Sequence, residues 1–204
     1  MVGNMLNVFA RASVAKFTDP VGAWLVRHRI SPDVATVVGT VGASLAAVTL
    51  FPTGYPLLGT LAVTFFLLFD LLDGAMARAA GTGGSFGAVL DASCDRVTDG
   101  MVFGSLAWWL LVNDRHVLGA ALLVCLVAAQ VVSYVKARAE AQGLDADGGF
   151  AERAERLVLL LTGTGLYGLG LGWALDLAVW VLLVLSVFTV GQRLLGAYRA
   201  RPGA

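Results

Sequence analysis

Four aspartates stand in otherwise apolar sequence between residues 70 and 95. Asp70 and Asp73 are three residues apart, and Asp91 and Asp95 are four apart, so each pair lies on one face of its helix. The intervening GTGGS segment disfavours helix, so we expect the two helices to form an antiparallel hairpin about Thr82. The hairpin brings the four carboxylates to nearly one depth, where they can share a pocket.

The charge of this cluster calls for compensation. A carboxylate near the middle of a membrane costs roughly 2.5 to 3.5 kcal/mol, so four unpaired ones would cost about 10 kcal/mol or more. Arg78 and Arg96 are too few to balance the four aspartates plus Asp99. Two divalent ions would balance the four charges, and ligands made only of oxygen favour Mg²⁺ or Mn²⁺. Paired ions of this kind assist displacement at phosphorus.

The composition is that of an integral membrane protein. Of 204 residues, 58% are hydrophobic and the mean hydropathy is +0.80, whereas a soluble domain has about 45 to 50% apolar residues. We predict an all-α, single-domain protein over residues 1–204, with a juxtamembrane part over 1–30 and a six-helix bundle over 31–201. The predicted spans are 34–51, 57–80, 86–112, 117–139, 157–173 and 175–195.

The basic residues predict the orientation. With six spans both termini share a side, and thirteen of the fourteen Lys and Arg fall on or near that side, against Arg115 alone opposite. By the positive-inside rule, both termini and the acidic cluster face the cytosol. We therefore expect a multi-pass protein of the cell (inner) membrane. Membrane lipid is a partner on this reading, and nucleic acid is not.

Residues 4–28 carry an approximately helical apolar stripe among polar positions. The stripe predicts an amphipathic helix in the membrane interface, interrupted at Pro20. The alternative is an ordinary packed helix end.

The acidic stretch contains a longer pattern. It reads DxxDGxxAR from Asp70 to Arg78, then eight residues, then GxxxDxxxD from Gly87 to Asp95. This resembles the full signature of the CDP-alcohol phosphotransferases, at every fixed position and at the spacer. Gly74 and Gly87 remove side chains beside the carboxylates and let a nucleotide approach the helix backbones. The alternative role of such small residues is tight helix packing.

The resemblance implies a reaction and roles for these residues. In this family a CDP-activated lipid is bound with two metal ions, held here by Asp70, Asp73, Asp91 and Asp95. The last of these, Asp95, would be the base that takes the proton of the acceptor hydroxyl, which attacks the lipid-bearing β-phosphate and expels CMP.

The resemblance also implies a CMP pocket. It would be lined by Asp73, Gly74, Ala77, Arg78, Thr82 and Gly87. Family members carry a Pro-Asn-like element before the first span, which here reads Ser31, Pro32, Asp33. An N-cap of the first span explains the same three residues.

A second basic cluster bears on the acceptor. Its residues are Lys136, Arg138, Arg153 and Arg193, with Ser133 beside them. They are either an anion site or positive-inside anchors. The patterns SYVKARAE, GGFAERAERL and TVGQRLL resemble those of bacterial phosphatidylinositol-phosphate synthases, which join CDP-diacylglycerol to inositol phosphate. That resemblance implies that this cluster holds the acceptor phosphate. It also implies a homodimer, for which the GTGLYGLGLG stretch of the fifth span is a candidate seam.

Other functions fit parts of the sequence. A phosphatidylglycerophosphate synthase would share the signature and also use an anionic acceptor, glycerol phosphate. Another CDP-alcohol phosphotransferase would share the signature as well. A divalent-cation transporter would place aspartates in membrane helices, but it needs ligands near the midplane and a path to both sides. A purely structural subunit leaves the four aspartates unexplained.

Overall fold

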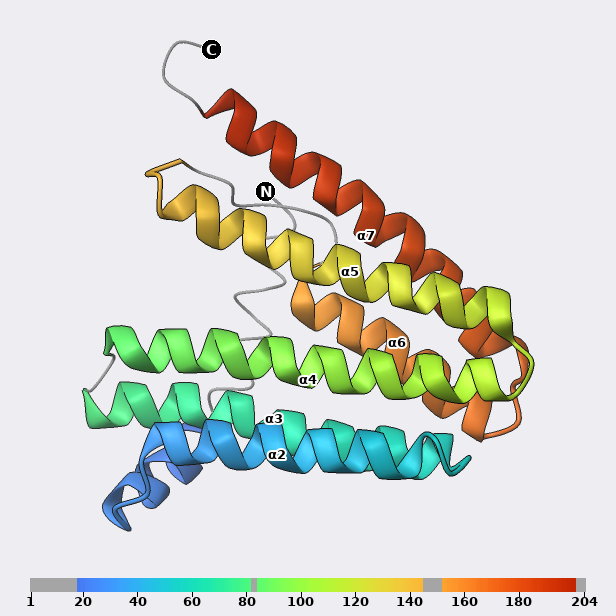
Figure 1. Ribbon diagram of the computed structural model, residues 1–204. Coiled ribbons are helices and arrows are strands. Elements are labelled where there is room, and N and C mark those ends of the chain that lie inside the picture. The colour runs from blue at the N-terminus through green and yellow to red at the C-terminus, as the bar shows by residue number, and fades with distance from the viewer. Residues whose placement is uncertain (1–17, 82–83, 145–151, 201–204) are drawn as a thin grey trace. The chain divides into compact units, whose positions relative to one another are not determined.

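The computed structural model describes residues 18–81, 84–144 and 152–200, and every regular element in these ranges is a helix (Figure 1). For Asp70 and Leu71 it describes the backbone but not the side chains. The helices are α2 (Pro32–Leu50), α3 (Pro56–Ala80), α4 (Ser85–Val112), α5 (His116–Glu140), α6 (Arg153–Gly168) and α7 (Trp173–Arg199). The all-α prediction is confirmed.

Each predicted span coincides with one helix. Five helices begin and end within four residues of the expected bounds, and the exception is α6, which ends at Gly168 instead of continuing to residue 173. Gly170 has a φ of +98° in the connection to α7, a conformation that glycine adopts without strain. The apolar residues of this turn look like helix in the sequence, which explains the error.

Among the described residues, four helices are long and apolar enough to cross a membrane: α2, α3, α5 and α7. The helix α4 has 28 residues, but residues 91–99 within it contain three aspartates and an arginine. The helix α6 has only 16 residues. Charge in one case and length in the other separate these two helices from a simple apolar span.

Helical residues 18–27 precede α2, and they include Pro20. The interruption predicted at Pro20 therefore does not occur within the described part of this segment. The apolar residues from 4 to 17 lie outside the described residues, so the interfacial helix as a whole stays a prediction.

The chain divides into two compact units, one within residues 1–45 and 62–98 and the other within 46–61 and 99–204. In the first unit, α2 approaches α3 closely through glycines. A Cβ atom on Gly42 would lie 2.2 Å from Cδ1 of Phe66, and one on Gly39 would lie 2.8 Å from Cβ of Phe69. Only hydrogen fits at these positions, and this close approach brings polar groups of the two helices together one turn further along.

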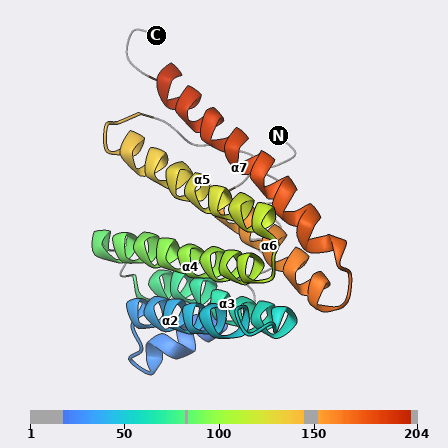
Figure 2. The same ribbon diagram turned by 45° about the vertical axis from the view of Figure 1, so that its right-hand side comes forward.

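In the second unit, α5 and α6 both pack against α7, as the two views show (Figures 1 and 2). A Cβ on Gly163 of α6 would lie 2.3 Å from the Cβ of Ala178 on α7, and one on Gly168 would lie 2.6 Å from the backbone nitrogen of Leu57. These glycines of the GTGLYGLGLG stretch serve packing within the chain. The expectation that the stretch is a dimer seam is thereby not supported at these two positions.

The end of the second unit at which α7 begins contains a polar and aromatic cluster. Arg115 forms an ion pair with Asp176, and its guanidinium lies 5.8 Å from the ring centroid of Tyr167. Tyr167 also packs edge-on against Trp109 at 5.4 Å. The cluster links the ends of α4 and α6 to the starts of α5 and α7.

Candidate active site

Asp73 is the most enclosed of the signature aspartates whose side chains are described. It is only 8% exposed, and its Oδ2 accepts a hydrogen bond of 2.5 Å from the hydroxyl of Thr36 on α2. The same hydroxyl lies 3.2 Å from the carbonyl oxygen of Pro32. Because the Thr36 hydroxyl fixes one carboxylate oxygen, the Asp73 side chain is oriented by the packing of α2 on α3.

The other aspartates differ in exposure. Asp91 is exposed on α4, and Asp95, one turn later, is half-buried with Oδ2 3.5 Å from Nη2 of Arg96. Asp70 lies on α3, one turn before Asp73, and its side chain is outside the description. Asp91 and Asp95 therefore share a face of α4, as the spacing predicted.

The candidate metal ligands in the first unit are of the chemical type that divalent metal ions prefer. Each described candidate ligand is a carboxylate, the ligand type that suits Mg²⁺ and Mn²⁺. Thr36 gives Asp73 the outer hydrogen bond that ligating carboxylates usually receive. Among the side chains that the structure describes, no three of His, Cys, Asp or Glu come close enough to hold an ion. The side chain of Asp70, the fourth predicted ligand, is not among them.

The start of α2 lies next to the second half of the signature. Oδ1 of Asp33 is 3.5 Å from the place that a Cβ on Gly87 would occupy. The backbone N–H of Val34 donates to Oγ of Ser31 at 3.3 Å, and Pro32 is the first residue of the helix. Ser31 and Pro32 therefore begin the helix, while Asp33 faces Gly87. The two interpretations of this element are compatible.

Three more residues of the predicted CMP pocket lie on α3. A Cβ on Gly74 would lie 3.6 Å from Nη1 of Arg78, and Ala77 is half-buried. The Arg78 guanidinium pairs with Asp19 at 2.9 Å, and both side chains are mostly exposed. An exposed pair of this kind is weak, so a phosphate can compete with Asp19 for the arginine. Thr82 lies outside the described residues.

The predicted acceptor residues belong to the second unit, and two of them are held inside it. Arg193 on α7 is 6% exposed, and its Nη1 donates to the carbonyl oxygen of Val132 on α5 at 3.2 Å. Arg153 begins α6, and its Nε lies 3.3 Å from Oδ1 of Asp99 on α4. These contacts fix both guanidinium groups against neighbouring helices.

The other three predicted acceptor residues lie on α5. The Ser133 hydroxyl donates to the carbonyl oxygen of Ala129 at 3.1 Å, and Lys136 pairs with Glu140 at 3.7 Å on the same helix. Arg138 is exposed. Exposure and pairing within one helix are what the anchor interpretation predicts for Lys136 and Arg138.

Three polar residues near these groups were not predicted as site residues. Thr36 binds Asp73, Asp99 binds Arg153, and Arg156 is only 2% exposed in the first turn of α6. Asp99 continues the spacing of the acidic face of α4, and Arg156 follows Arg153 of the basic cluster by three residues, so both had a signal in the sequence. Thr36 had none.

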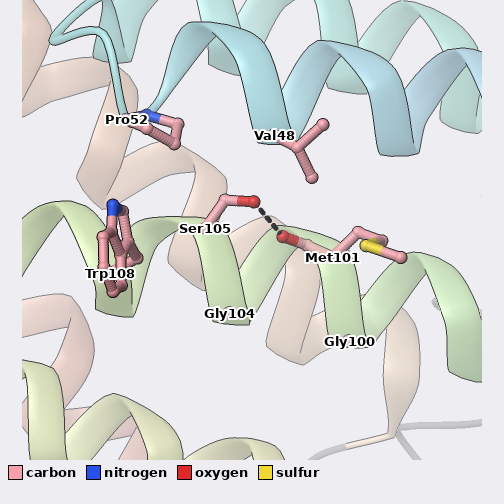
Figure 3. A pocket seen from close by; sticks show the side chains of 7 residues that line it. All are labelled: Val48, Pro52, Gly100, Met101, Gly104, Ser105 and Trp108. Carbon is pink, nitrogen blue, oxygen red and sulfur yellow. Dashed lines mark hydrogen bonds between the residues drawn. The ribbon is translucent and has the colours of Figure 1, made fainter.

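The second unit also contains an apolar groove (Figure 3). It has a volume of about 410 Å³ and is lined by Val48, Pro52, Gly100, Met101, Gly104, Ser105 and Trp108. Its single hydroxyl, that of Ser105, already donates to the carbonyl oxygen of Met101 at 2.6 Å. The groove therefore offers an apolar surface and no catalytic group.

Comparison with known proteins identifies the family. The family model of the CDP-alcohol phosphatidyltransferases matches residues 29–191. The phosphatidylinositol phosphate synthase of Mycobacteroides abscessus is 50% identical over 202 residues, which cover 98% of this chain and 91% of that protein. The synthase of the same name from Mycobacterium tuberculosis H37Rv is 49% identical over 203 residues, covering 98% and 93%.

Solved structures agree with this result. The crystal structure of the Mycobacterium tuberculosis phosphatidylinositol phosphate synthase with CDP-DAG bound has a TM-score of 0.87 and 49% identity, covering 92% of this chain and 96% of that one. The structure of that enzyme with manganese and citrate has a TM-score of 0.86 and 50% identity, covering 91% and 90%. The protein is thus an integral membrane enzyme, and the chain belongs to the CDP-alcohol phosphatidyltransferase family.

Proposed function

We propose that the enzyme transfers the phosphatidyl group of CDP-diacylglycerol to inositol phosphate, forming phosphatidylinositol phosphate and CMP. The observation that carries the choice of acceptor is the burial of Arg193. A topological anchor needs contact with water or lipid headgroups, whereas this arginine is 6% exposed and held by the Val132 carbonyl. Buried cations are retained where an anion or a built polar environment compensates them. The names of relatives that are about 50% identical support the same acceptor.

The donor lipid is the ligand of the first unit on this proposal. The CMP pocket would be lined by Ser31, Pro32, Asp33, Gly74, Ala77, Thr82 and Gly87. Arg78 would exchange its contact with Asp19 for one with a phosphate oxygen. The four aspartates of the signature would hold two divalent ions, Mg²⁺ or Mn²⁺, which supply charge compensation for the diphosphate. The structure of a relative with manganese supports this assignment.

Asp95 would act as the base. Its carboxylate takes the proton of an inositol phosphate hydroxyl, and the hydroxyl oxygen attacks the lipid-bearing β-phosphorus. The bond from that phosphorus to the bridging oxygen breaks, and CMP leaves with the electron pair. Arg153 and Arg193 would hold the phosphate of the acceptor, with Ser133 and Lys136 as further candidates. Arg138, which was predicted to join them, is exposed on α5 and would be a topological anchor instead.

The proposal is tested by CMP release from CDP-diacylglycerol with a panel of acceptors. With purified enzyme and Mg²⁺ or Mn²⁺, we expect release with inositol phosphate and little with free inositol, because the free alcohol lacks the dianion. Glycerol phosphate is the matched control, since it carries the same charge on a smaller alcohol. A higher kcat/KM for glycerol phosphate would identify a phosphatidylglycerophosphate synthase instead.

The membrane arrangement is part of the proposal. The helices α2 to α7 would all be membrane helices, with the interfacial helix, both termini and the active site at the cytosolic side of the cell membrane. The thirteen basic residues at one side support this orientation. We also propose a single domain and a homodimer.

Cysteines at the two ends of α4 test the orientation. Ser85 and Asn113 are both exposed and lie at opposite ends of this helix. In a background with Cys94 and Cys125 replaced, Ser85→Cys should react with an impermeant thiol reagent only in inside-out vesicles. Asn113→Cys should react in intact cells. The reverse labelling would place the active site outside the cell.

A further inference from the structure

Asp99 is the most buried acidic side chain in the described part of the second unit. It is 1% exposed, and its Oδ1 lies 3.3 Å from Nε of Arg153. A buried carboxylate in a membrane helix is costly, so it persists where a cation compensates it. Asp99 and Arg153 belong to different helices, α4 and α6, and are 54 residues apart in the chain. The pair is therefore a tertiary contact that fixes the start of α6.

The contact is made at one particular edge of the guanidinium. Arginine has five N–H donors, one on Nε and four on the two terminal nitrogens. The terminal fork matches two oxygens of a phosphate group. A carboxylate at Nε fixes the plane of the guanidinium without using the four terminal donors. The contact with Asp99 and the binding of a phosphate are therefore compatible on one arginine.

Holding the Arg153 side chain in place before the acceptor binds affects the free energy of binding. The arginine side chain is long, and holding it in one rotamer costs entropy that a ligand must otherwise supply. An arginine that is already held loses less when the ligand arrives, and its affinity for the ligand rises accordingly. The N-cap residue Glu152 makes no side-chain capping bond. The contact with Asp99 restrains Arg153 at this helix end.

We propose that Asp99 is a positioning residue that orients Arg153 for the phosphate of the acceptor. The inference rests on the proposed function, because it takes Arg153 as a ligand of inositol phosphate. Asp99 acts through Arg153 and does not touch the reacting atoms. Two other roles make different predictions: a purely structural ion pair would affect folding alone, and a carboxylate that repels the acceptor would weaken binding by its charge.

The test is the acceptor KM of Asp99 variants. Asp99→Asn keeps the shape and one acceptor oxygen but loses the charge, and it should raise the KM for inositol phosphate severalfold. Asp99→Ala should raise it about tenfold or more. The KM for CDP-diacylglycerol should stay within about twofold of the wild-type value. If the repulsion of the carboxylate dominated, both substitutions would lower the acceptor KM.

Asp176→Ala is the matched control. It also removes an aspartate of the second unit that pairs with an arginine, in this case Arg115. This pair lies at the opposite end of the helices from Asp99 and Arg153. The substitution should lower the melting temperature without changing the acceptor KM. An equal rise of the acceptor KM in Asp176→Ala and Asp99→Ala would show a general loss of structure and overturn the proposal.

The dependence on Arg153 separates this inference from the proposed function. In an Arg153→Ala background, adding Asp99→Ala should cause no further rise of the acceptor KM, and an additive rise would overturn the positioning role. An unchanged acceptor KM in Arg153→Ala itself would refute Arg153 as a ligand, and with it the proposed acceptor site. If Asp99→Ala does not fold, Asp99→Asn decides: an unchanged or lower acceptor KM refutes the proposal.

Discussion

Asp95→Asn is expected to lower kcat by about 10² to 10⁴, the usual contribution of a general base, while CDP-diacylglycerol still binds. The amide cannot take the proton of the acceptor hydroxyl, but it has nearly the shape of the carboxylate. The three remaining aspartates of the signature would continue to hold the lipid and its metal ions. The measurement combines steady-state CMP release with titration of CDP-diacylglycerol into the purified variant.

Asp91→Asn is the control for this experiment. Asp91 lies one turn before Asp95 on α4, and it is proposed as a metal ligand only. Its replacement should weaken metal and nucleotide binding together, as isothermal titration would show. Normal turnover by the Asp95→Asn variant would show that Asp95 is not the base. Unchanged metal affinity in Asp91→Asn would contradict the two-metal site.

Arg193→Ala is expected to raise the KM for inositol phosphate by about 10- to 150-fold, since a charge-assisted hydrogen bond contributes about 1.5 to 3 kcal/mol. The KM for CDP-diacylglycerol should change little, because the proposed nucleotide ligands are other residues. Initial rates with each substrate varied in turn provide both constants. Arg138→Ala is the control: this arginine is exposed on α5, and its loss should leave the acceptor KM within about twofold.

Two results would count against the assignment of Arg193. Wild-type acceptor kinetics in a folded Arg193→Ala would make this residue an element of structure. A similar rise of the acceptor KM in Arg138→Ala would mean that the whole basic cluster attracts the anion at long range. A rise confined to Arg193→Ala supports direct contact with the phosphate.

Much of the fold could be predicted because long apolar segments have few alternatives in a membrane. The bounds of α2, α3, α4, α5 and α7 follow from where apolar sequence begins and ends. The end of α6 could not be predicted this way, since the residues after Gly168 are as apolar as the helix itself. There the backbone at Gly170, and not hydrophobicity, ends the element.

The candidate site was only partly predictable. The signature aspartates are close in sequence, so helical periodicity was enough to group them. The contact of Thr36 with Asp73 joins residues 37 apart and depends on the close approach of α2 and α3 at Gly39 and Gly42. Likewise, the sequence presented Arg138 and Arg193 as equals, while the structure exposes one and buries the other.

The length of α6 has a consequence for the depth at which the substrates meet. Its 16 residues extend about 24 Å, while the hydrocarbon core of a bilayer is about 30 Å thick. On the proposed topology, the Gly168 end of α6 is at the outer side of the membrane. The first turn of α6, at its other end, would then lie deeper in the bilayer than the cytosolic headgroups. Arg153, which is only half-buried, would then line a recess into which a water-soluble sugar phosphate descends to reach a lipid that stays in the bilayer. Catalysis would depend on membrane thickness, because a thicker bilayer buries the mouth of that recess.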